Sequence, residues 1–422
     1  MATREQIVET PDRDSTPRAM AEAVARRSRS KLVAFLASRS GDVAAAEDAL
    51  SEAFAAALES WPATGCPASP EAWLLTVARR KLIDQSRRQR GEAGADELES
   101  MAGALGQAAA EGEIPDRRLA LLFACAHPAI DPAIRAPLML QTVLGLDASR
   151  IASAFLLSPS AMGQRLVRAK SKIRMAGIPF RVPEREELPD RLEAVLDAIY
   201  AAYADGWTDP AGTDVARRDL AEEAIYLCRM VTELLPGEAE AWGLLALMLY
   251  AEARRAARRD TAGRYVPLAQ QESRLWDETK IGEAESALRR AAKLGVIGRY
   301  QLEAAIQSAH VERRVTGRPR WPAILQLYDV LVALTESPVA AINRTLALAE
   351  VEGPTAALNA LPAVESDPRL ADYQPYWAAR ADLLARSGEF GEARRAYEVA
   401  IGLASDPSVR QFLEQRQAEL AD

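Results

Sequence analysis

The chain of 422 residues has few of the residues that build disulfide frameworks and metal sites. Its three cysteines, Cys66, Cys125 and Cys228, are far apart and form no CxxC pair. An odd, scattered set of this kind is typical of a protein from a reducing compartment. The two histidines, His127 and His310, exclude a histidine-rich metal site, and Cys125 and His127 have no further ligand nearby. We therefore expect neither a metal nor a cofactor.

Apolar runs long enough to cross a membrane are also missing. Residues 1–18 are polar and charged, which argues against a signal peptide. The sequence has no phosphate-binding glycine loop, no nucleophile elbow and no paired-histidine metal helix. We expect a soluble, cytoplasmic protein that is not an enzyme and does not bind membranes.

Aromatic residues make up only 6% of the chain, which is rich in Ala, Leu, Arg and Glu. These four are strong helix formers, so the composition predicts an all-α fold. Lys and Arg number 52 against 60 Asp and Glu, a net charge of −8 that on average disfavours nucleic acid. The basic residues are nevertheless concentrated locally, with seven and no acid in residues 148–183 and six with one acid in residues 73–90. The average therefore hides two basic helices.

The N-terminal part has the periodicity of amphipathic helices. Residues 42–60 place Ala and Leu on one face and acidic side chains on the other. Residues 61–70, with three prolines and a glycine, predict a loop before the basic helix that begins at Pro70. Residues 91–115 contain six acids and no Lys or Arg, which predicts a flexible linker.

Residues 144–174 predict a helix-turn-helix, with Ser158 as N-cap and Pro159 as the first residue of the second helix. Met162, Leu166, Ala169 and Ile173 recur at helical spacing and are expected to face inward. Arg and Gln can bond base edges bidentately, so the other face is a candidate for reading the major groove. That face carries Ser160, Ala161, Gln164, Arg165, Arg168 and Lys172. The alternative is a solvated basic helix in a bundle.

The basic helix at 73–90 is a second candidate for contact with nucleic acid. Its cations could bind a phosphate backbone, while Trp73 either stacks on a base or packs in the core. Asp84 lies four residues from Arg80 and Arg88, so it also fits an ion pair on the helix surface. The alternative for the whole helix is an ordinary charged surface.

The region from 185 to 422 contains repeats. Trp377, Ala381, Leu384, Gly388 and Phe390 begin a copy that ends at Ala400, in the large-and-small pattern of tetratricopeptide (TPR) repeats. A second copy, from 242 to 291, is interrupted by an insertion rich in Arg, Gln and Asp. We count about five helix pairs, which together predict an α-solenoid.

Residues 46–54 and 70–84 and the helix-turn-helix, in this order, resemble a bacterial sigma factor of the extracytoplasmic-function (ECF) type. The rest of the chain resembles the subgroup with a long TPR-like extension. The resemblance implies an all-α chain of two small helical sigma domains and a TPR-like solenoid. The implied parts are region 2 at 18–90, the acidic linker at 91–115, region 4 at 116–182 and the TPR-like domain at 185–422.

The same resemblance implies three sets of contacts and no catalytic residue. The residues implied to contact the β′ clamp helices of core RNA polymerase are Glu47, Asp48, Glu52 and Phe54. The β flap is implied as a second contact on the polymerase. The family captures and melts the −10 element of the promoter. The residues implied to contact this element are Trp73, Arg79, Arg80, Lys81, Asp84, Arg87 and Arg88. The helix at 160–172 would read the −35 element. The TPR-like domain would tune activity in cis, with an unknown protein or peptide as its ligand.

Two other functions fit part of these features. One is a helix-turn-helix regulator with a TPR sensor or partner-binding domain that does not replace sigma, and it needs no binding to core polymerase. The other is a TPR scaffold whose N-terminal helices bind protein. The scaffold differs from a promoter-binding protein because it lacks salt-dependent affinity for DNA.

Overall fold

The structure is a computed structural model. It describes scattered positions between 20 and 40 and residues 43–90, 116–176, 183–207, 215–362 and 367–420. In these parts the secondary structure is helical, apart from one isolated bridge between Arg259 and Tyr265, which confirms the predicted all-α fold. The predicted linker at 91–115 lies outside the described residues. No helix in the described ranges has both the length and the apolarity required to cross a bilayer.

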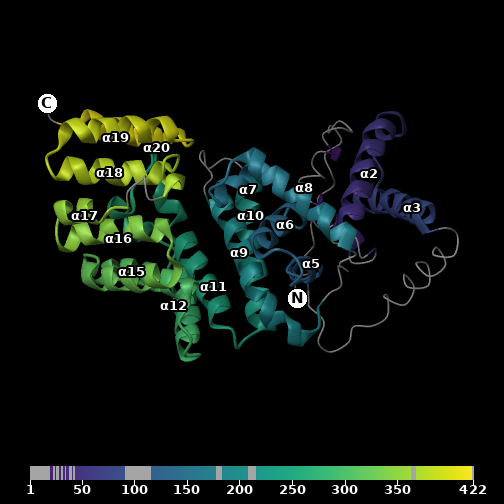
Figure 1. Cartoon of the computed structure of the whole chain (residues 1–422), viewed down its shortest axis with the longest axis horizontal. Helices are drawn as coiled ribbons and strands as arrows, with labels where there is room; N and C mark the ends of the chain where they lie inside the picture. The colour runs from purple at the N-terminus through teal and green to yellow at the C-terminus, as the bar shows by residue number, and fades with distance from the viewer. Residues whose placement is uncertain are drawn as a thin grey trace, which may run out of the picture. The chain divides into compact units, whose positions relative to one another are not determined.

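The chain divides into two compact units. One consists of Met1–Asp147 and Arg165–Arg191, and the other of Ala148–Gln164 and Leu192–Asp422. The helices before residue 177, labelled in Figure 1, are α2 (Val43–Thr64), α3 (Pro70–Arg90), α5 (Arg117–Cys125), α6 (Pro132–Thr142), α7 (Ala148–Ala154) and α8 (Pro159–Ala176).

Helices α2 and α3 pack against each other through small and aliphatic side chains. Leu50 and Ala53 of α2 are fully buried, as the apolar stripe predicts, and Leu74 and Ala78 of α3 are fully buried as well. The predicted loop at 61–70 was wrong in its first residues, because α2 continues through Pro62 to Thr64.

The extension of α2 past the predicted boundary follows from the packing of Trp61. The indole of Trp61 is 1% exposed, and its ring centroid lies 5.5 Å from that of Trp73 in an edge-to-face contact. Burial of so large a side chain offsets the hydrogen bond that Pro62 cannot make. The helix then ends at Gly65, whose left-handed φ of 81° favours glycine and whose N–H donates to the Trp61 carbonyl at 2.9 Å.

Helices α5 and α6 form the second apolar centre of the first unit. Asp116 caps α5 by accepting a hydrogen bond from the Arg118 N–H at 2.7 Å, and Asp131 caps α6. Arg191 is 2% exposed, and its Nη1 donates to the Phe123 carbonyl at 3.1 Å. The residues after position 184 therefore contribute to this core.

The remaining helices form an array in which most contacts join neighbours along the chain. Figure 1 shows α15 to α19 stacked in succession, from green to yellow. The α-helices are α9 (Leu188–Trp207), α10 (Val215–Leu234), α11 (Ala239–Ala253), α12 (Glu278–Lys293), α13 (Arg299–Val311), α14 (Arg313–Thr316), α15 (Trp321–Thr335), α16 (Pro338–Val351), α17 (Pro354–Ala360), α18 (Gln374–Arg386), α19 (Phe390–Leu403) and α20 (Pro407–Ala418). The 3-10 helices are η2 (Arg185–Glu187), η3 (Arg255–Arg258), η4 (Leu268–Gln270), η5 (Ser273–Leu275) and η6 (Pro368–Leu370).

The best-matching repeat forms the helix pair α18 and α19. Ala381, Ala393 and Ala400 are fully buried between the helices, and Tyr397 fills the adjoining space. Gly388 makes the turn with a φ of 85°. The small residues of the pattern therefore lie where two helices approach most closely.

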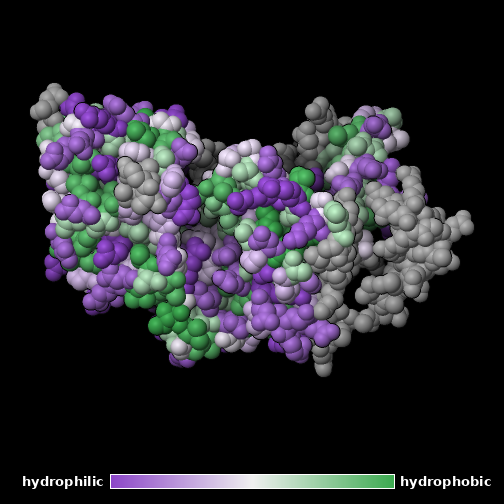
Figure 2. Space-filling model, in the orientation of Figure 1, coloured by the Kyte–Doolittle hydropathy of each residue, from purple (hydrophilic) through white to green (hydrophobic). Residues whose placement is uncertain are grey.

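Helices α11 and α13 approach even more closely, at Gly243. A Cβ atom added there would lie 2.6 Å from the Gln301 backbone nitrogen. The Glu240 carboxylate accepts hydrogen bonds from the N–H groups of Tyr300 at 2.8 Å and Gln301 at 3.0 Å. It thereby satisfies two of the free donors at the start of α13. The turn that follows α12 exposes Val296 and Ile297, and Figure 2 shows hydrophobic side chains at this end of α12.

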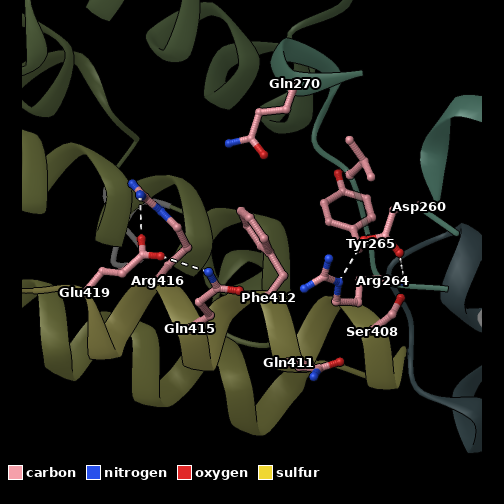
Figure 3. A pocket seen from close by; sticks show the side chains of 11 residues that line it. Asp260, Arg264, Tyr265, Gln270, Ser408, Gln411, Phe412, Gln415, Arg416 and Glu419 are labelled. Atoms are coloured by element: carbon pink, nitrogen blue, oxygen red, sulfur yellow. Dashed lines mark hydrogen bonds and ion pairs between the residues drawn. The ribbon is translucent and has the colours of Figure 1, made fainter. Parts of the chain in front are cut away.

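The insertion between α11 and α12, residues 254–277, departs from this neighbour-to-neighbour pattern. Arg259 donates from Nη2 to Asp406 at 3.1 Å and from Nη1 to Ser408 at 2.7 Å. The rings of Tyr265 and Phe412 meet edge to face with centroids 5.5 Å apart. The insertion therefore docks on α20, and both sides of this contact are drawn in Figure 3.

Candidate polymerase and nucleic-acid interface

Helices α7 and α8 are joined by a short turn. Leu156 has a left-handed φ of 52°, and the Leu157 N–H donates to the Ala152 carbonyl at 3.0 Å. Ser158 then accepts from the Ala161 N–H at 3.3 Å, the N-cap hydrogen bond that the sequence predicts. Pro159 opens α8, where its missing N–H costs nothing.

One side of α8 is buried and the other is solvent-exposed. Met162, Leu166 and Ile173 are buried, as their spacing predicts, whereas Ala169 is half-buried. Of the predicted −35 contacts, Ala161 is half-buried and the others are exposed, namely Ser160, Gln164, Arg165, Arg168 and Lys172. Five polar or basic side chains on this side of α8 are therefore open to an external ligand.

The second half of α8 borders an open hollow of about 500 Å³. Arg165, Arg168 and Lys172 line it together with Asp131, the cap of α6. Three cations with one carboxylate leave an excess of positive charge. This side of α8 therefore attracts anions.

Two basic residues of the helix-turn-helix, outside its predicted base-reading face, have carboxylate partners within the protein. Lys170 Nζ lies 2.6 Å from Glu47 Oε2, and Arg150 pairs with Asp205. The Lys170–Glu47 pair joins positions 123 residues apart, and no local sequence signal indicates it. It links the predicted DNA-reading helix to one of the predicted polymerase contacts.

The acidic side of α2 differs in exposure along its length. Asp48 and Glu52 are exposed, whereas Glu47 and Phe54 are half-buried. The Ser51 hydroxyl donates to the Glu47 carbonyl at 2.8 Å, so it is bonded to its own helix. Asp48 and Glu52 are therefore the predicted polymerase contacts that are open to solvent.

The predicted −10 contacts lie along α3. Trp73 is half-buried against Trp61, which favours packing over an open stacking surface for that ring. Arg79, Arg80, Lys81 and Asp84 are exposed. The side chains of Arg87 and Arg88 lie outside the described part of the chain.

Lys81 and Glu52 bring the α2 and α3 sets together, with Nζ and Oε2 2.9 Å apart. Both side chains are nearly half exposed, so their ion pair contributes little to stability. Within the described residues, Asp84 forms no ion pair with Arg80. The exposed carboxylate of Asp84 is therefore not explained by that pairing.

No metal centre emerges from the described residues, which hold no cluster of three or more potential ligands. Cys125 is buried, and its Sγ lies 3.8 Å from Thr142 Oγ1. Burial raises the pKa of the Cys125 thiol to about 12, so the thiol stays protonated. The His127 ring accepts a hydrogen bond from the Ala129 N–H at 3.1 Å.

Residues 24–92 match sigma-70 region 2, and residues 191–292 match a family of unknown function, DUF6596. A protein of Rhizobium meliloti (strain 1021), named "Uncharacterized protein R00370", is 37% identical over 385 residues. That similarity covers 89% of this chain and 90% of that protein. No solved structure matches the chain.

Region 2 is the part of sigma-70 factors that implies binding to core RNA polymerase and promoter DNA. Its match includes α2, α3 and the acidic and basic faces described above. The chain belongs to the same family as the Rhizobium meliloti protein, and its residues 24–92 match sigma-70 region 2.

Proposed function

We propose that this chain is an ECF-type sigma factor that binds core RNA polymerase, recognises −35 and −10 elements and initiates transcription. The observation that carries the proposal is a sigma-70 region 2 in the same chain as α8, with its exposed basic face. It acts in the cytoplasm through binding energy and needs no catalytic residue, metal or cofactor.

In this proposal the acidic side of α2 binds the β′ clamp helices of core polymerase. Asp48 and Glu52 are exposed for this contact, whereas Glu47 must first exchange Lys170 for a polymerase cation. Opening that ion pair also frees Lys170 for a phosphate. The two binding events therefore favour each other. The β flap holds region 4 over the −35 element.

The basic face of α3 holds the melted −10 element, and α8 reads the −35 element in the major groove. Gln164 and Arg165 lie in the first half of α8, where base edges are reached first. Gln164→Ala or Arg165→Ala should relax −35 specificity by about 1–3 kcal/mol for each lost bidentate contact. An equal loss on every sequence would assign these residues to phosphate contacts.

The C-terminal array tunes this activity in cis as a TPR-like domain. The basic helices belong to a chain of net charge −8, so acidic residues elsewhere can shield them in the free protein. Deleting residues 184–422 tests shielding only if the first unit survives. Because Arg191 bonds the Phe123 carbonyl, a truncation must keep residues up to at least 191.

Run-off transcription with core polymerase on promoter fragments tests the proposal, with Asp48→Lys and Glu59→Lys as a matched pair. Both positions are exposed on α2, but only Asp48 is a predicted polymerase contact. We expect specific initiation by the natural chain and by Glu59→Lys, and at least about tenfold weaker core binding by Asp48→Lys.

Other outcomes select between the alternatives. DNA binding without core binding would make the chain a helix-turn-helix regulator with a TPR sensor domain. Absence of both would make it a TPR scaffold. Core binding without initiation would indicate that the C-terminal array holds the sigma regions inactive.

A further inference from the structure

The insertion at 254–277 borders a hollow of about 400 Å³ within the C-terminal array. Trp207 at the end of α9 forms one side, and η3 and the start of α12 form the others. The basic side chains that line it are Arg255, Arg258, Arg259 and Lys280, against the carboxylates Glu252 and Asp277. The hollow therefore has an excess of positive charge.

Both carboxylates already have partners. Glu252 accepts hydrogen bonds from Arg255 Nε through both oxygens, at 2.8 and 2.9 Å. Asp277 caps α12 and lies 2.6 Å from Lys280 Nζ. Arg259 pairs with Asp406, the N-cap of α20, at 3.1 Å. The charge left without compensation in this hollow is that of Arg258.

Arg258 is held in place without a carboxylate. Its Nη1 donates to the Trp207 carbonyl at 2.8 Å, and its Cζ lies 3.9 Å from the centre of the Trp207 ring. Trp207 is stacked on Tyr203, with centroids 6.3 Å apart and an interplanar angle of 20°. Among the described residues no acidic side chain forms an ion pair with Arg258. A guanidinium has five N–H donors, so most of its hydrogen-bonding capacity is available to a ligand.

The neighbouring cations increase the positive potential around this site. Arg254 donates to Gln307 Oε1 at 2.5 Å and Arg313 to the Gln271 carbonyl at 2.7 Å, both uncharged acceptors. Burial lowers the pKa of Arg254 to about 10, and the neighbouring Arg258 and Arg313 contribute to the decrease. These guanidiniums remain charged at neutral pH, so each of them contributes Coulomb attraction to a bound anion.

A second hollow, on the α20 side of the insertion, has a different charge balance. It measures about 250 Å³, and Figure 3 shows its lining side chains. There Arg264 pairs with Asp260, and Arg416 pairs with Glu419. The charges within each pair cancel, and the other polar groups that line this hollow are amides and hydroxyls. Of the two hollows that border the insertion, the one beside Trp207 is therefore the one with an excess of positive charge.

We propose that the hollow beside Arg258 binds a small anionic ligand through a phosphate or carboxylate group. The planar fork of Arg258 suits the paired oxygens of either group, and its fixed position lowers the entropic cost of binding. Displacing water from the hollow strengthens this contact. The site lies outside the surfaces that the proposed sigma function uses, so it can be tested without polymerase.

The experiment is isothermal titration calorimetry on the full chain with pyrophosphate in one arm and succinate in the other. Sodium chloride keeps the ionic strength constant. Three variants accompany the natural protein. Arg258→Gln removes the guanidinium, Ala256→Glu adds a carboxylate at an exposed lining position, and Arg289→Gln changes an exposed arginine outside the hollow.

We expect saturable binding of at least one of the two anions. Arg258→Gln and Ala256→Glu should weaken it at least tenfold, and Arg289→Gln should change it less than twofold. Saturation in only one arm identifies the group as phosphate or carboxylate. If Arg258→Gln does not fold, Ala256→Glu decides alone, because position 256 is exposed. Absence of saturable binding in both arms, or equal affinity of all variants, would overturn the proposal.

Discussion

Helix α8 and the insertion of the C-terminal array are both rich in arginine but use it in different ways. On α8, Arg165 and Arg168 are exposed on one face, with Lys172 one turn further. In the array, Arg254 and Arg258 lie against aromatic rings, carbonyls and an amide. The first arrangement suits a long external polyanion, whereas the second holds a guanidinium rigidly and suits a small ligand or a structural role.

The two regions also differ in how substitutions should affect stability. Substitutions on the exposed face of α8 change the free energy of unfolding little. In the array, where the backbones of two helices approach closely at Gly243, added atoms disturb the packing. Changes on α8 should therefore affect binding alone, and changes inside the array should affect stability first.

The largest effect is expected from removing the α8 cations together. In Arg165→Ala/Arg168→Ala/Lys172→Ala, promoter affinity should fall on the order of 100-fold at low salt, and the salt slope should decrease by about 2–3. The melting temperature should stay unchanged. Fluorescence anisotropy over a range of salt concentrations measures both quantities.

Arg289→Ala/Lys293→Ala/Arg395→Ala is the matched control, because it removes the same charge from exposed positions of the array. If this control weakens DNA binding as much as the α8 variant, the net charge of the chain governs affinity and α8 has no special role.

Gly243→Ala should lower the free energy of unfolding by about 1–3 kcal/mol, because the new Cβ meets the Gln301 backbone, which cannot yield as a flexible side chain can. Gly282→Ala in α12 is the control, since a Cβ there meets nothing within 4 Å. It should be neutral or stabilise by up to about 1 kcal/mol. Urea unfolding followed by circular dichroism compares them, and equal effects would contradict the close approach of α11 and α13.

His310 predicts a pH dependence of the array. Burial first, and then the nearby Arg254 and Arg313, lower its pKa from 6.5 to about 4. Between these values the unfolded chain binds a proton that the folded chain excludes. The free energy of unfolding should therefore fall by about 1–3 kcal/mol as the pH falls from 6.5 to 4.

His310→Phe keeps a ring against Trp321, whose centroid lies 5.4 Å from that of His310, but cannot titrate. The variant should lose part of the pH dependence that the natural chain shows in urea unfolding between pH 6.5 and 4. Identical slopes for both proteins would mean that His310 titrates normally.

The smallest change in stability is expected at the pair formed by Glu52 and Lys81. Because both side chains are nearly half exposed, Glu52→Gln should change the free energy of unfolding by less than about 0.5 kcal/mol. Core polymerase binding should nevertheless weaken measurably. If Glu52→Gln lowers stability but leaves core binding unchanged, Glu52 supports the fold and does not contact polymerase.

Local sequence signals predicted the helices well where caps and periodicity agree. Ser158 and Pro159 start α8, and the buried Met162 and Leu166 follow its apolar stripe. The pair α18 and α19 follows from small residues at fixed spacing. These signals act within a few residues, so they are readable without the fold.

The sequence pattern failed where packing overrode a local rule. Three prolines and a glycine indicate a loop at 61–70, yet burial of Trp61 against Trp73 keeps Pro62 within α2. For Trp73 the sequence left packing and stacking open, because the contact depends on how the two helices meet.

The sequence by itself determined the all-α composition, the helix starts, the repeat pattern and the two basic helices, since each depends on residue type and spacing. Only the tertiary structure decided which partner each charged side chain finds. Lys170 pairs with Glu47, Arg259 pairs with Asp406, and Arg258 bonds the Trp207 carbonyl. These partners are 123, 147 and 51 residues apart in the chain. Coulomb and hydrogen-bond energies depend on distance in space, which position along the chain does not reveal.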